Sequence, residues 1–256
     1  MGEDVLDKLG EILEDMQDDV GEQAELVDER LDDIPDSYSM PDLEDMTLHE
    51  AKQFRLGIVF LDINSFTGYT QSHPPRDVLF MLNVFIPKVM DLVRGLDGAF
   101  EKNTGDGVLT YFGAGEDDDV VADSVLAYFF GVQLLLHLAV NPVLENYDVE
   151  PISISGGAGL GDTHISRIGI HGMNRRTAVS VTGNVAAKLE DKADTNQYYV
   201  DQGIAEYASD DGIGSLLEQA GTLAGYKWGN AVTGWTDPAE YYEFPDLGGT
   251  IAEELR

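Results

Sequence analysis

The chain has 256 residues, a hydrophobic content of 43% and a formal net charge of −33. This length can bury one substantial core, and the excess of acidic residues argues against broad contact with nucleic acid or an anionic membrane. The absence of cysteine excludes disulfides and thiolate metal sites and is consistent with a reducing compartment. The first ten residues lack the features of a secretory signal, and the apolar run from Val125 to Val140 is interrupted by Gln133 and His137. We expect a soluble, cytoplasmic protein that binds neither nucleic acid nor membrane.

The first 46 residues contain 18 acidic and 2 basic residues. Apolar residues recur in them at helical spacing: Val5, Leu9, Ile12, Met16, Val27, Leu31 and Ile34. This spacing predicts one or two amphipathic helices, which either pack on the rest of the chain or associate as a coiled coil. Pro35 and Pro41 then indicate a linker. We therefore predict an acidic helical extension and linker over 1–46 and a globular catalytic domain over 47–256.

Alternating apolar runs and helical patterns follow in the rest of the chain. The patterns predict helices over 75–92, 117–139 and 184–193, and strands over 55–63, 99–100, 108–112, 152–160, 164–170, 177–182, 198–200 and 241–244. This order predicts an α+β fold with a ferredoxin-like β-α-β-β-α-β core. We expect a mostly antiparallel sheet with its helices on one face, preceded by the helical extension.

Two aspartates lie where predicted strands end or turn. Asp62 ends a buried apolar run, and Asp106 lies between Gly105 and Gly107 at a predicted hairpin turn. Each has an ordinary explanation, as a strand-end cap or as a turn former. If the two strands are neighbours, however, the carboxylates converge on one point. Paired carboxylates beside a main-chain carbonyl favour Mg²⁺ or Mn²⁺.

Four ordered motifs resemble the class III nucleotide cyclases. They are DINSFT at 62–67, Leu82-Asn83 within a helix, KNTGDGVLTYFG at 102–113 and NVAAKLED from Asn184. The resemblance covers roughly 56–200. It implies an enzyme that converts a nucleoside triphosphate into a 3′,5′-cyclic mononucleotide and pyrophosphate.

The resemblance also implies roles for the residues that match the motifs. Asp62 and Asp106 match the metal-binding aspartates, and the carbonyl of Ile63 matches the main-chain ligand of two divalent ions, Mg²⁺ or Mn²⁺. These ions lower the pKa of the ribose 3′-hydroxyl for attack on the α-phosphorus. Asn184 matches the residue that orients the ribose. Lys188 replaces the usual transition-state arginine, so the compact charge of an ammonium group replaces the planar guanidinium of the family.

Other residues match positions that bind the substrate. Lys102 and Thr177 correspond to base-reading positions of adenylate cyclases, although Lys102 could equally be a solvated strand-edge lysine. Lys227 corresponds to a late lysine that holds the triphosphate, or is an ordinary loop lysine. Tyr69 could offer a hydroxyl or a stacking face to a base, or belong to the core.

The substrate is less defined than the reaction. A single cyclase domain and the altered motif SVTGNVAAKL, at 180–189, are similar to the stand-alone pyrimidine cyclases of bacterial antiphage systems, called Pycsar. That likeness implies cyclic UMP or cyclic CMP as the product. An adenylate cyclase and a catalytically inactive nucleotide-binding module are the alternatives. A metal-dependent phosphatase or nuclease is disfavoured, because His171 lacks obvious partners and Arg175 and Arg176 fit a solvated turn.

The resemblance finally implies a homodimer. In this family the metal-binding aspartates of one subunit face the asparagine and the cation of the other. The chain has both halves, Asp62 with Asp106 and Asn184 with Lys188. We therefore expect two composite sites across a two-fold interface.

Overall fold

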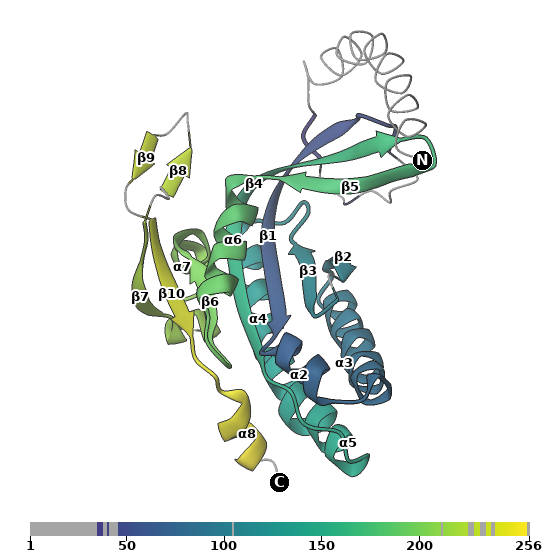
Figure 1. Ribbon diagram of the computed structural model, residues 1–256. Helices are drawn as coiled ribbons and strands as arrows, with labels where there is room; N and C mark the ends of the chain where they lie inside the picture. The colour runs from purple at the N-terminus through teal and green to yellow at the C-terminus, as the bar shows by residue number, and fades with distance from the viewer. Residues whose placement is uncertain are drawn as a thin grey trace, which may run out of the picture. The chain divides into compact units, whose positions relative to one another are not determined.

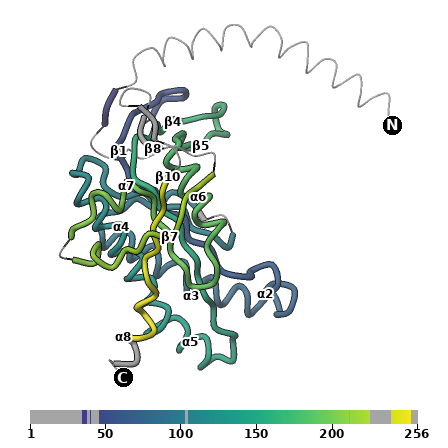
Figure 2. The backbone as a smooth tube through the Cα atoms, turned by 90° about the vertical axis from the view of Figure 1, so that its left-hand side faces the viewer, coloured from purple at the N-terminus to yellow at the C-terminus, as the bar shows by residue number. Residues whose placement is uncertain are grey.

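A computed structural model describes residues 35–37, 40, 46–103, 105–210, 212–224, 228–230, 234–236 and 239–254 (Figures 1 and 2). The chain divides into two compact units. Among the described residues, the smaller unit comprises 35–37, 46–53 and 164–178, and the larger comprises 40, 54–163 and 179–254. The predicted helices of the extension lie outside the described residues. The predicted domain boundary at residue 46 therefore stays a prediction.

A mixed sheet forms the framework of the fold. Its strands run in the order β2-β3-β1-β4-β6-β10-β7, with β5 paired to β4. The bounds are β1 Ala51–Ile63, β2 Ala99–Asn103, β3 Gly107–Phe112, β4 Ile154–Ile170, β5 Met173–Val179, β6 Tyr198–Asp201, β7 Glu218–Leu223 and β10 Ala239–Phe244. The β1–β3, β2–β3, β6–β10 and β7–β10 pairs are antiparallel, whereas β4 and β6 are parallel. The predicted α+β fold with a mostly antiparallel sheet is confirmed.

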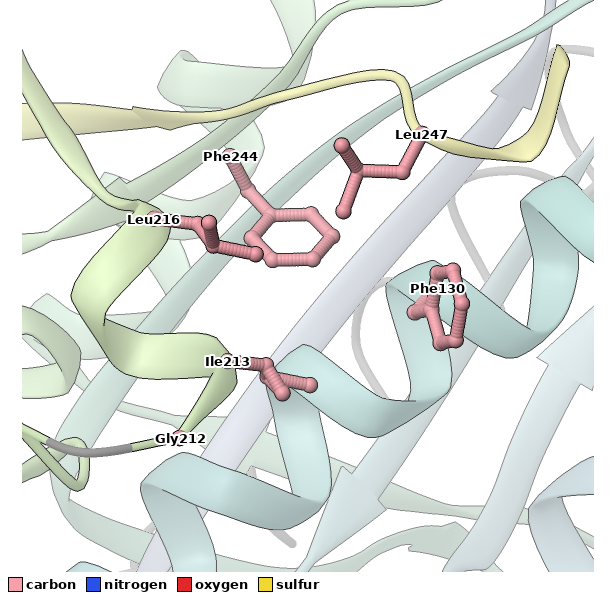
Figure 3. A pocket seen from close by; sticks show the side chains of 6 residues that line it. All are labelled: Phe130, Gly212, Ile213, Leu216, Phe244 and Leu247. Carbon is pink, nitrogen blue, oxygen red and sulfur yellow. The ribbon is translucent and has the colours of Figure 1, made fainter. Parts of the chain in front are cut away.

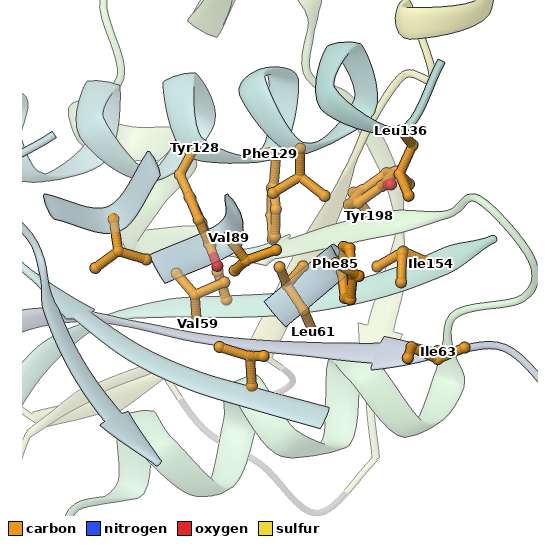
Figure 4. Packing of buried hydrophobic residues seen from close by; sticks show 14 of the residues in the cluster. Val59, Leu61, Ile63, Phe85, Val89, Tyr128, Phe129, Leu136, Ile154 and Tyr198 are labelled. Atoms are coloured by element: carbon orange, nitrogen blue, oxygen red, sulfur yellow. The ribbon is translucent and has the colours of Figure 1, made fainter. Parts of the chain in front are cut away.

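The main core of the larger unit lies between this sheet and two long helices. Helix α3 covers Pro75–Gly95 and α4 covers Asp118–Leu135; a proline in the first turn of α3 and Asp118 and Asp119 in that of α4 suit helix starts. Figure 4 shows Tyr128 and Phe129 of α4 facing Val59 and Leu61 of β1 across this core. All four side chains are buried. Leu56 and Ile58, on the opposite face of β1, are buried as well. Burial on both faces explains why β1 is a nearly continuous apolar run.

The apolar character of α4 has the same origin. The helix continues through a π-helical turn, Leu136–Val140, into α5, Asn141–Asn146. By length and composition alone, the stretch Asp118–Asn146 is long and apolar enough to cross a membrane, but half of its most apolar window is buried inside the protein. Packing against the sheet accounts for that apolarity.

A third helix, α6 (Val181–Lys192), packs on the opposite face of the sheet. Successive residues of β4 show this, because strand neighbours point to opposite faces. A Cβ atom added at Gly156 would meet Phe129 of α4, whereas one added at Gly157 would lie 2.1 Å from the backbone nitrogen of Glu190 in α6. The expectation that the helices cover a single face was therefore wrong.

Two further boundaries differ from the sequence-based expectation. Strand β4 runs unbroken over Ile154–Ile170, where separate strands over 152–160 and 164–170 were expected around Gly161 and Asp162. Helix α6 begins at Val181 inside the expected strand 177–182. The cause is a cap, since the Ser180 hydroxyl oxygen accepts a hydrogen bond of 2.8 Å from the Gly183 nitrogen.

A buried carboxylate joins the centre of the sheet to its neighbours. The Asp201 carboxylate at the end of β6 accepts hydrogen bonds from the Leu160 nitrogen at 3.2 Å and from the Ile204 nitrogen at 3.0 Å. Burial raises the pKa of Asp201 to about 7, against the lowering effect of these bonds. The side chain thereby connects β4, β6 and helix α7, Gln202–Tyr207.

Shorter elements complete the larger unit. They are helix α2, Phe66–Ser72, a 3₁₀ turn, Ile213–Leu216, strands β8, Trp228–Asn230, and β9, Gly234–Thr236, and helix α8, Gly248–Glu254. In the smaller unit, β5 folds back on the end of β4, and the Arg167 nitrogen donates to the Glu50 carbonyl at 3.1 Å.

The close approach of α6 to β4 gives a first prediction. Replacing Gly157 by alanine places a methyl group against backbone atoms of Glu190 and Ala186, so α6 must shift. We expect Gly157→Ala to lower the free energy of unfolding by ~1–3 kcal/mol, as overpacking does. Gly68→Ala is the control, since that Cβ would meet nothing within 4 Å. Equal thermal midpoints for the two variants would contradict the packing described here.

Candidate active site

The ends of β1 and β3 bring Asp62 and Asp106 together. In the antiparallel register Asp62 lies opposite Gly107, and the Ile63 nitrogen donates to the Asp106 carbonyl at 3.3 Å. Both aspartates are half-buried. Directly opposed residues of paired strands are roughly 5 Å apart. The expected neighbouring strands are therefore present, and we refer to Asp62 and Asp106 as the acid pair.

The acid pair lies in an electrostatically unfavourable environment. Burial and the negative charge of Asp106 raise the pKa of Asp62 to about 6. No basic side chain is among the causes of this shift. Half-buried carboxylates that repel each other are typical of a site that receives a cation. Asp62, Asp106 and the Ile63 carbonyl offer the hard oxygen ligands that Mg²⁺ and Mn²⁺ favour, so the residues fit the implied ions.

The protein supplies only part of a metal coordination shell. Among the described residues, no group of three or more His, Cys, Asp or Glu side chains is placed to hold a metal ion. Divalent ions of this kind commonly take their remaining ligands from water and substrate phosphates. Tight binding of an ion at the acid pair would then depend on a phosphate ligand.

A third acidic residue near the acid pair was missed in the sequence. Glu190 of α6 is half-buried, and burial together with the charges of Asp62, Asp191 and Asp106 raises its pKa to about 7. No local pattern in the sequence marks it, because its position depends on the packing of α6 against β4. Ala186 and Glu190 are four residues apart, and the backbone of both contacts the position of Gly157. Glu190 thus adds negative charge on the side from which α6 covers the sheet.

Asn184 and Lys188 lie on the exposed side of the same helix. They are also four residues apart, and both are exposed. The Lys188 ammonium lies 3.5 Å from the Asp191 carboxylate, and its side chain is 56% exposed. In the part of the chain that the structure describes, neither residue is hydrogen-bonded or ion-paired to the acid pair. Within one chain, then, the structure does not bring the two predicted halves of the site into contact.

The remaining predicted site residues have different surroundings. Lys102 is exposed on β2 opposite Leu109, in the same hairpin as Asp106. Thr177 is half-buried on β5 in the smaller unit. Lys227 lies outside the described residues. The roles of these three residues stay predictions.

Tyr69 is the buried residue of helix α2. It is 9% exposed, its hydroxyl donates to the Glu150 carbonyl at 3.0 Å, and its ring stacks on His73. His73 in turn lies 2.9 Å from the Glu150 carboxylate. These contacts indicate a structural role for Tyr69. Its hydroxyl could bind a base only by giving up the hydrogen bond to the Glu150 carbonyl.

The larger unit also contains an apolar pocket of about 280 Å³. Figure 3 shows its lining side chains, which come from α4, the 3₁₀ turn, β10 and the segment after β10. The lining residues are Phe130, Gly212, Ile213, Leu216, Phe244 and Leu247. None of them is a predicted site residue, and the pocket offers no ligand for a metal or a phosphate.

Solved structures share this arrangement of strands and helices. The chain superposes on the guanylyl cyclase Cya2 with a TM-score of 0.63 and 21% identity, over 75% of this chain and 92% of that one. It superposes on the adenylyl cyclase CyaB from P. aeruginosa with a TM-score of 0.65 and 17% identity, over 77% and 96%. The chain has the fold of a class III nucleotide cyclase domain. The predicted resemblance to that family is confirmed.

Curated relatives support the same likeness to cyclases at the level of sequence. The chain is 28% identical over 159 residues to a cytidylate cyclase of Staphylococcus aureus, covering 58% of this chain and 36% of that protein. It is 30% identical over 159 residues to a cytidylate cyclase of Escherichia coli, covering 58% and 34%. The chain therefore spans about a third of the length of these relatives. No family model matches the chain.

A second prediction concerns ion binding at the acid pair, independent of any activity. At pH 7.5, Mn²⁺ at 100 times its dissociation constant should raise the free energy of unfolding by ~2.7 kcal/mol through mass action. Protons compete for Asp62, whose pKa is about 6, so the gain should shrink as the pH falls through 6. Thermal unfolding with and without Mn²⁺ at pH 5.5 and 7.5 measures this gain.

Two variants distinguish ion binding at the acid pair from nonspecific cation binding to the acidic surface. Asp62→Asn should lose the Mn²⁺-dependent gain, whereas Asp97→Asn, at an exposed turn where φ is 55°, should keep it. Without Mn²⁺, Asp62→Asn should unfold at a higher temperature than the unsubstituted protein at pH 7.5. The reason is that it removes a half-buried charge that Asp106 and Glu190 repel. An equal Mn²⁺ effect on both variants would place the ions elsewhere.

Proposed function

We propose that this protein is a metal-dependent nucleotide cyclase that converts a pyrimidine nucleoside triphosphate into its 3′,5′-cyclic monophosphate and pyrophosphate. The observation on which the proposal rests is the acid pair, two half-buried carboxylates on adjacent strands in a chain with the class III cyclase fold. CTP is the first candidate substrate, because both curated relatives reported above are named cytidylate cyclases. UTP is the second candidate, and ATP remains the alternative outside the pyrimidines.

The acid pair and the Ile63 carbonyl would hold one or two divalent cations. When bound, such ions lower the pKa of a coordinated hydroxyl and neutralise phosphate charge. In the reaction, the ribose 3′-oxygen forms a bond to the α-phosphorus, the bond from that phosphorus to the pyrophosphate oxygen breaks, and the hydroxyl proton passes to solvent. Asn184 orients the ribose in this proposal. Lys188 provides positive charge for the phosphate oxygens as their charge develops.

Base selection would fall to Lys102 and Thr177, which match base-reading positions of the family. The exposed ammonium of Lys102 can donate to a carbonyl oxygen of cytosine or uracil. The Thr177 hydroxyl can donate or accept, which suits either pyrimidine edge. We further propose that the product is a second messenger in antiphage defence and that the enzyme acts in the cytoplasm as a homodimer.

Product analysis tests the proposal directly. The purified full chain is incubated with ATP, GTP, CTP and UTP in separate reactions with Mn²⁺, and the products are identified by mass. We expect cyclic CMP, with loss of product in Asp62→Asn and Asp106→Asn, because each change removes an anionic ligand while preserving side-chain size. Asp97→Asn is the matched control for loss of one acidic charge. Cyclic UMP as the only product would identify UTP as the substrate in place of CTP. Cyclic AMP would identify ATP as the substrate.

Other products would point to a different class of protein. Nucleoside diphosphate and free phosphate would indicate a phosphatase. Nucleotide binding without any product, although the fold and the Mn²⁺ response are intact, would show an inactive binding module. Full turnover by both aspartate variants would contradict the assignment of the acid pair.

A third prediction concerns Lys188. Lys188→Ala should lower kcat by ~10²-fold or more with a smaller change in KM, because a cation aimed at developing charge acts mainly in the transition state. Lys188→Arg should retain much of the activity, since it preserves the charge. The matched control is Lys192→Ala, one helical turn further along α6, where the ammonium lies over the Tyr241 ring. A rise in KM alone would show that Lys188 only binds substrate.

A fourth prediction follows from the exposed position of Asn184 and Lys188. If the site is completed by a second copy, Asp62→Asn and Asn184→Ala chains are each inactive alone but active when mixed. One site of the mixed dimer contains both substitutions and the other contains neither, so random exchange should restore roughly a quarter of the unsubstituted activity. Mass measurement of intact dimers confirms the exchange. An inactive mixture after exchange would show that each site forms within one chain.

A further inference from the structure

A single asparagine connects the end of β1 to the start of β4. The Asn64 nitrogen donates to the Ser153 carbonyl at 2.9 Å, and the Asn64 side-chain nitrogen donates to the Ser155 hydroxyl oxygen at 2.9 Å. Ser153 directly precedes β4, and Ser155 is the second residue of that strand and is buried. Asn64 is therefore attached to the β4 side of the sheet at two points, one through its backbone and one through its side chain.

The backbone bond of Asn64 sets the direction of the Ile63 carbonyl. That carbonyl and the Asn64 N–H belong to one peptide group, and in a trans peptide they point in opposite directions. Strand β1 lies between β3 and β4 in the sheet. Because the N–H points to Ser153 on the β4 side, the carbonyl points to the β3 side. Asp106 lies on that side, directly before β3, so the carbonyl is directed toward the side of the acid pair.

The chain leaves the sheet directly after Asn64, so this peptide group has no continuing strand to hold it. Strand β1 ends at Ile63, and Ser65 has a φ of 57°, the left-handed conformation from which the chain enters α2. This conformation is unfavourable for a residue with a Cβ atom. A rotation of the peptide group between Ile63 and Asn64 could relieve it. The side-chain bond to Ser155 opposes such a rotation.

The Asn64 side chain also carries a cost in stability. Its Oδ1 atom is buried, and among the described residues it has no hydrogen-bond partner. A buried acceptor without a donor is destabilising. Such groups are rare in folded proteins and call for a functional or structural reason. The bond from the amide nitrogen to Ser155, next to the acid pair, supplies that reason.

We propose that Asn64 is a positioning residue of the candidate active site. Its bond to Ser155 holds the peptide group between Ile63 and Asn64, so that the Ile63 carbonyl stays available to a cation at the acid pair. This inference rests on the proposed function, in which that carbonyl is a metal ligand. Asn64 itself contacts neither the ion nor the substrate. Groups that orient a metal ligand change metal affinity by roughly 10–100-fold when they are removed.

Mn²⁺ binding to the full chain tests this role without turnover. Electron paramagnetic resonance measures the free ion at about 0.2 M salt, which screens the acidic surface. The binding that Asp62→Asn loses is assigned to the acid pair. We expect Asn64→Ala to raise the dissociation constant of Mn²⁺ at this site by roughly 10-fold. Ser155→Ala, a smaller change at the other end of the same bond, should raise it by a similar factor. The double variant should bind no more weakly than Asn64→Ala, because both residues act through one contact.

Asn141→Ala is the matched control for loss of an asparagine contact beside β4. The Asn141 side chain donates to the Ile152 carbonyl at 2.9 Å and accepts from the Ile152 nitrogen at 3.0 Å. Its removal leaves the Ile152 backbone without these bonds while both bonds of Asn64 are kept. This control should lower the thermal midpoint and leave the affinity for Mn²⁺ unchanged. Circular dichroism confirms that each variant is folded.

The outcomes separate this inference from the proposed function. Unchanged Mn²⁺ affinity in Asn64→Ala would overturn the positioning role and leave the proposed function in place. Equal weakening by Asn141→Ala would also overturn it, because general loosening of the segment before β4 would then set the affinity. So would a double variant weakened by the product of the two single factors, since the residues would then act separately. If the unsubstituted protein binds no more Mn²⁺ than Asp62→Asn does, the ion site is absent and both proposals fail.

Discussion

The antiparallel register between β1 and β3 is the constraint on which the candidate site depends. Asp62 faces Gly107 across the pair, and the bond from the Ile63 nitrogen to the Asp106 carbonyl fixes the ends of the two strands. A slip of one residue would turn every side chain of β1 to the other face of the sheet. The buried contacts of Val59 and Leu61 in the core oppose such a slip. Core packing and placement of the acid pair are therefore consequences of the same register.

The site gains its chemistry at a cost in stability. Asp62 and Glu190 are half-buried acids with raised pKa values, so near neutral pH the folded protein holds negative charge that burial and neighbouring carboxylates disfavour. By linkage, the contribution of each group to stability is present below its ordinary pKa and is lost as the pH rises through about 6 for Asp62 and about 7 for Glu190. Cations bound at the acid pair would reverse this penalty. The same arrangement that weakens the empty protein thus favours binding of divalent ions.

Sequence patterns predicted elements whose signals are local. The apolar run of β1, the proline-initiated α3 and the glycine-flanked Asp106 all lie where their patterns indicate. The patterns failed where a long-range contact decides. Gly161 and Asp162 suggest a turn, yet β4 continues through them because neighbouring strands pair along its length. Glu190 was missed because its proximity to Asp62 depends on the packing of α6 against Gly157, which no local pattern encodes.

The distribution of charge explains how so acidic a chain could handle a polyanionic substrate. A nucleoside triphosphate is repelled by a net charge of −33, so binding requires local positive potential. The proposed ions at the acid pair supply it at one end of the site. The acid-free stretch between Asp162 and Glu190 includes Asn184 and Lys188, so α6 presents a surface with less negative charge than the rest of the chain. Asp191 offsets Lys188 only weakly, because an exposed ion pair contributes about 0–1 kcal/mol. Lys188 therefore stays available to a phosphate group, as the proposed composite site requires.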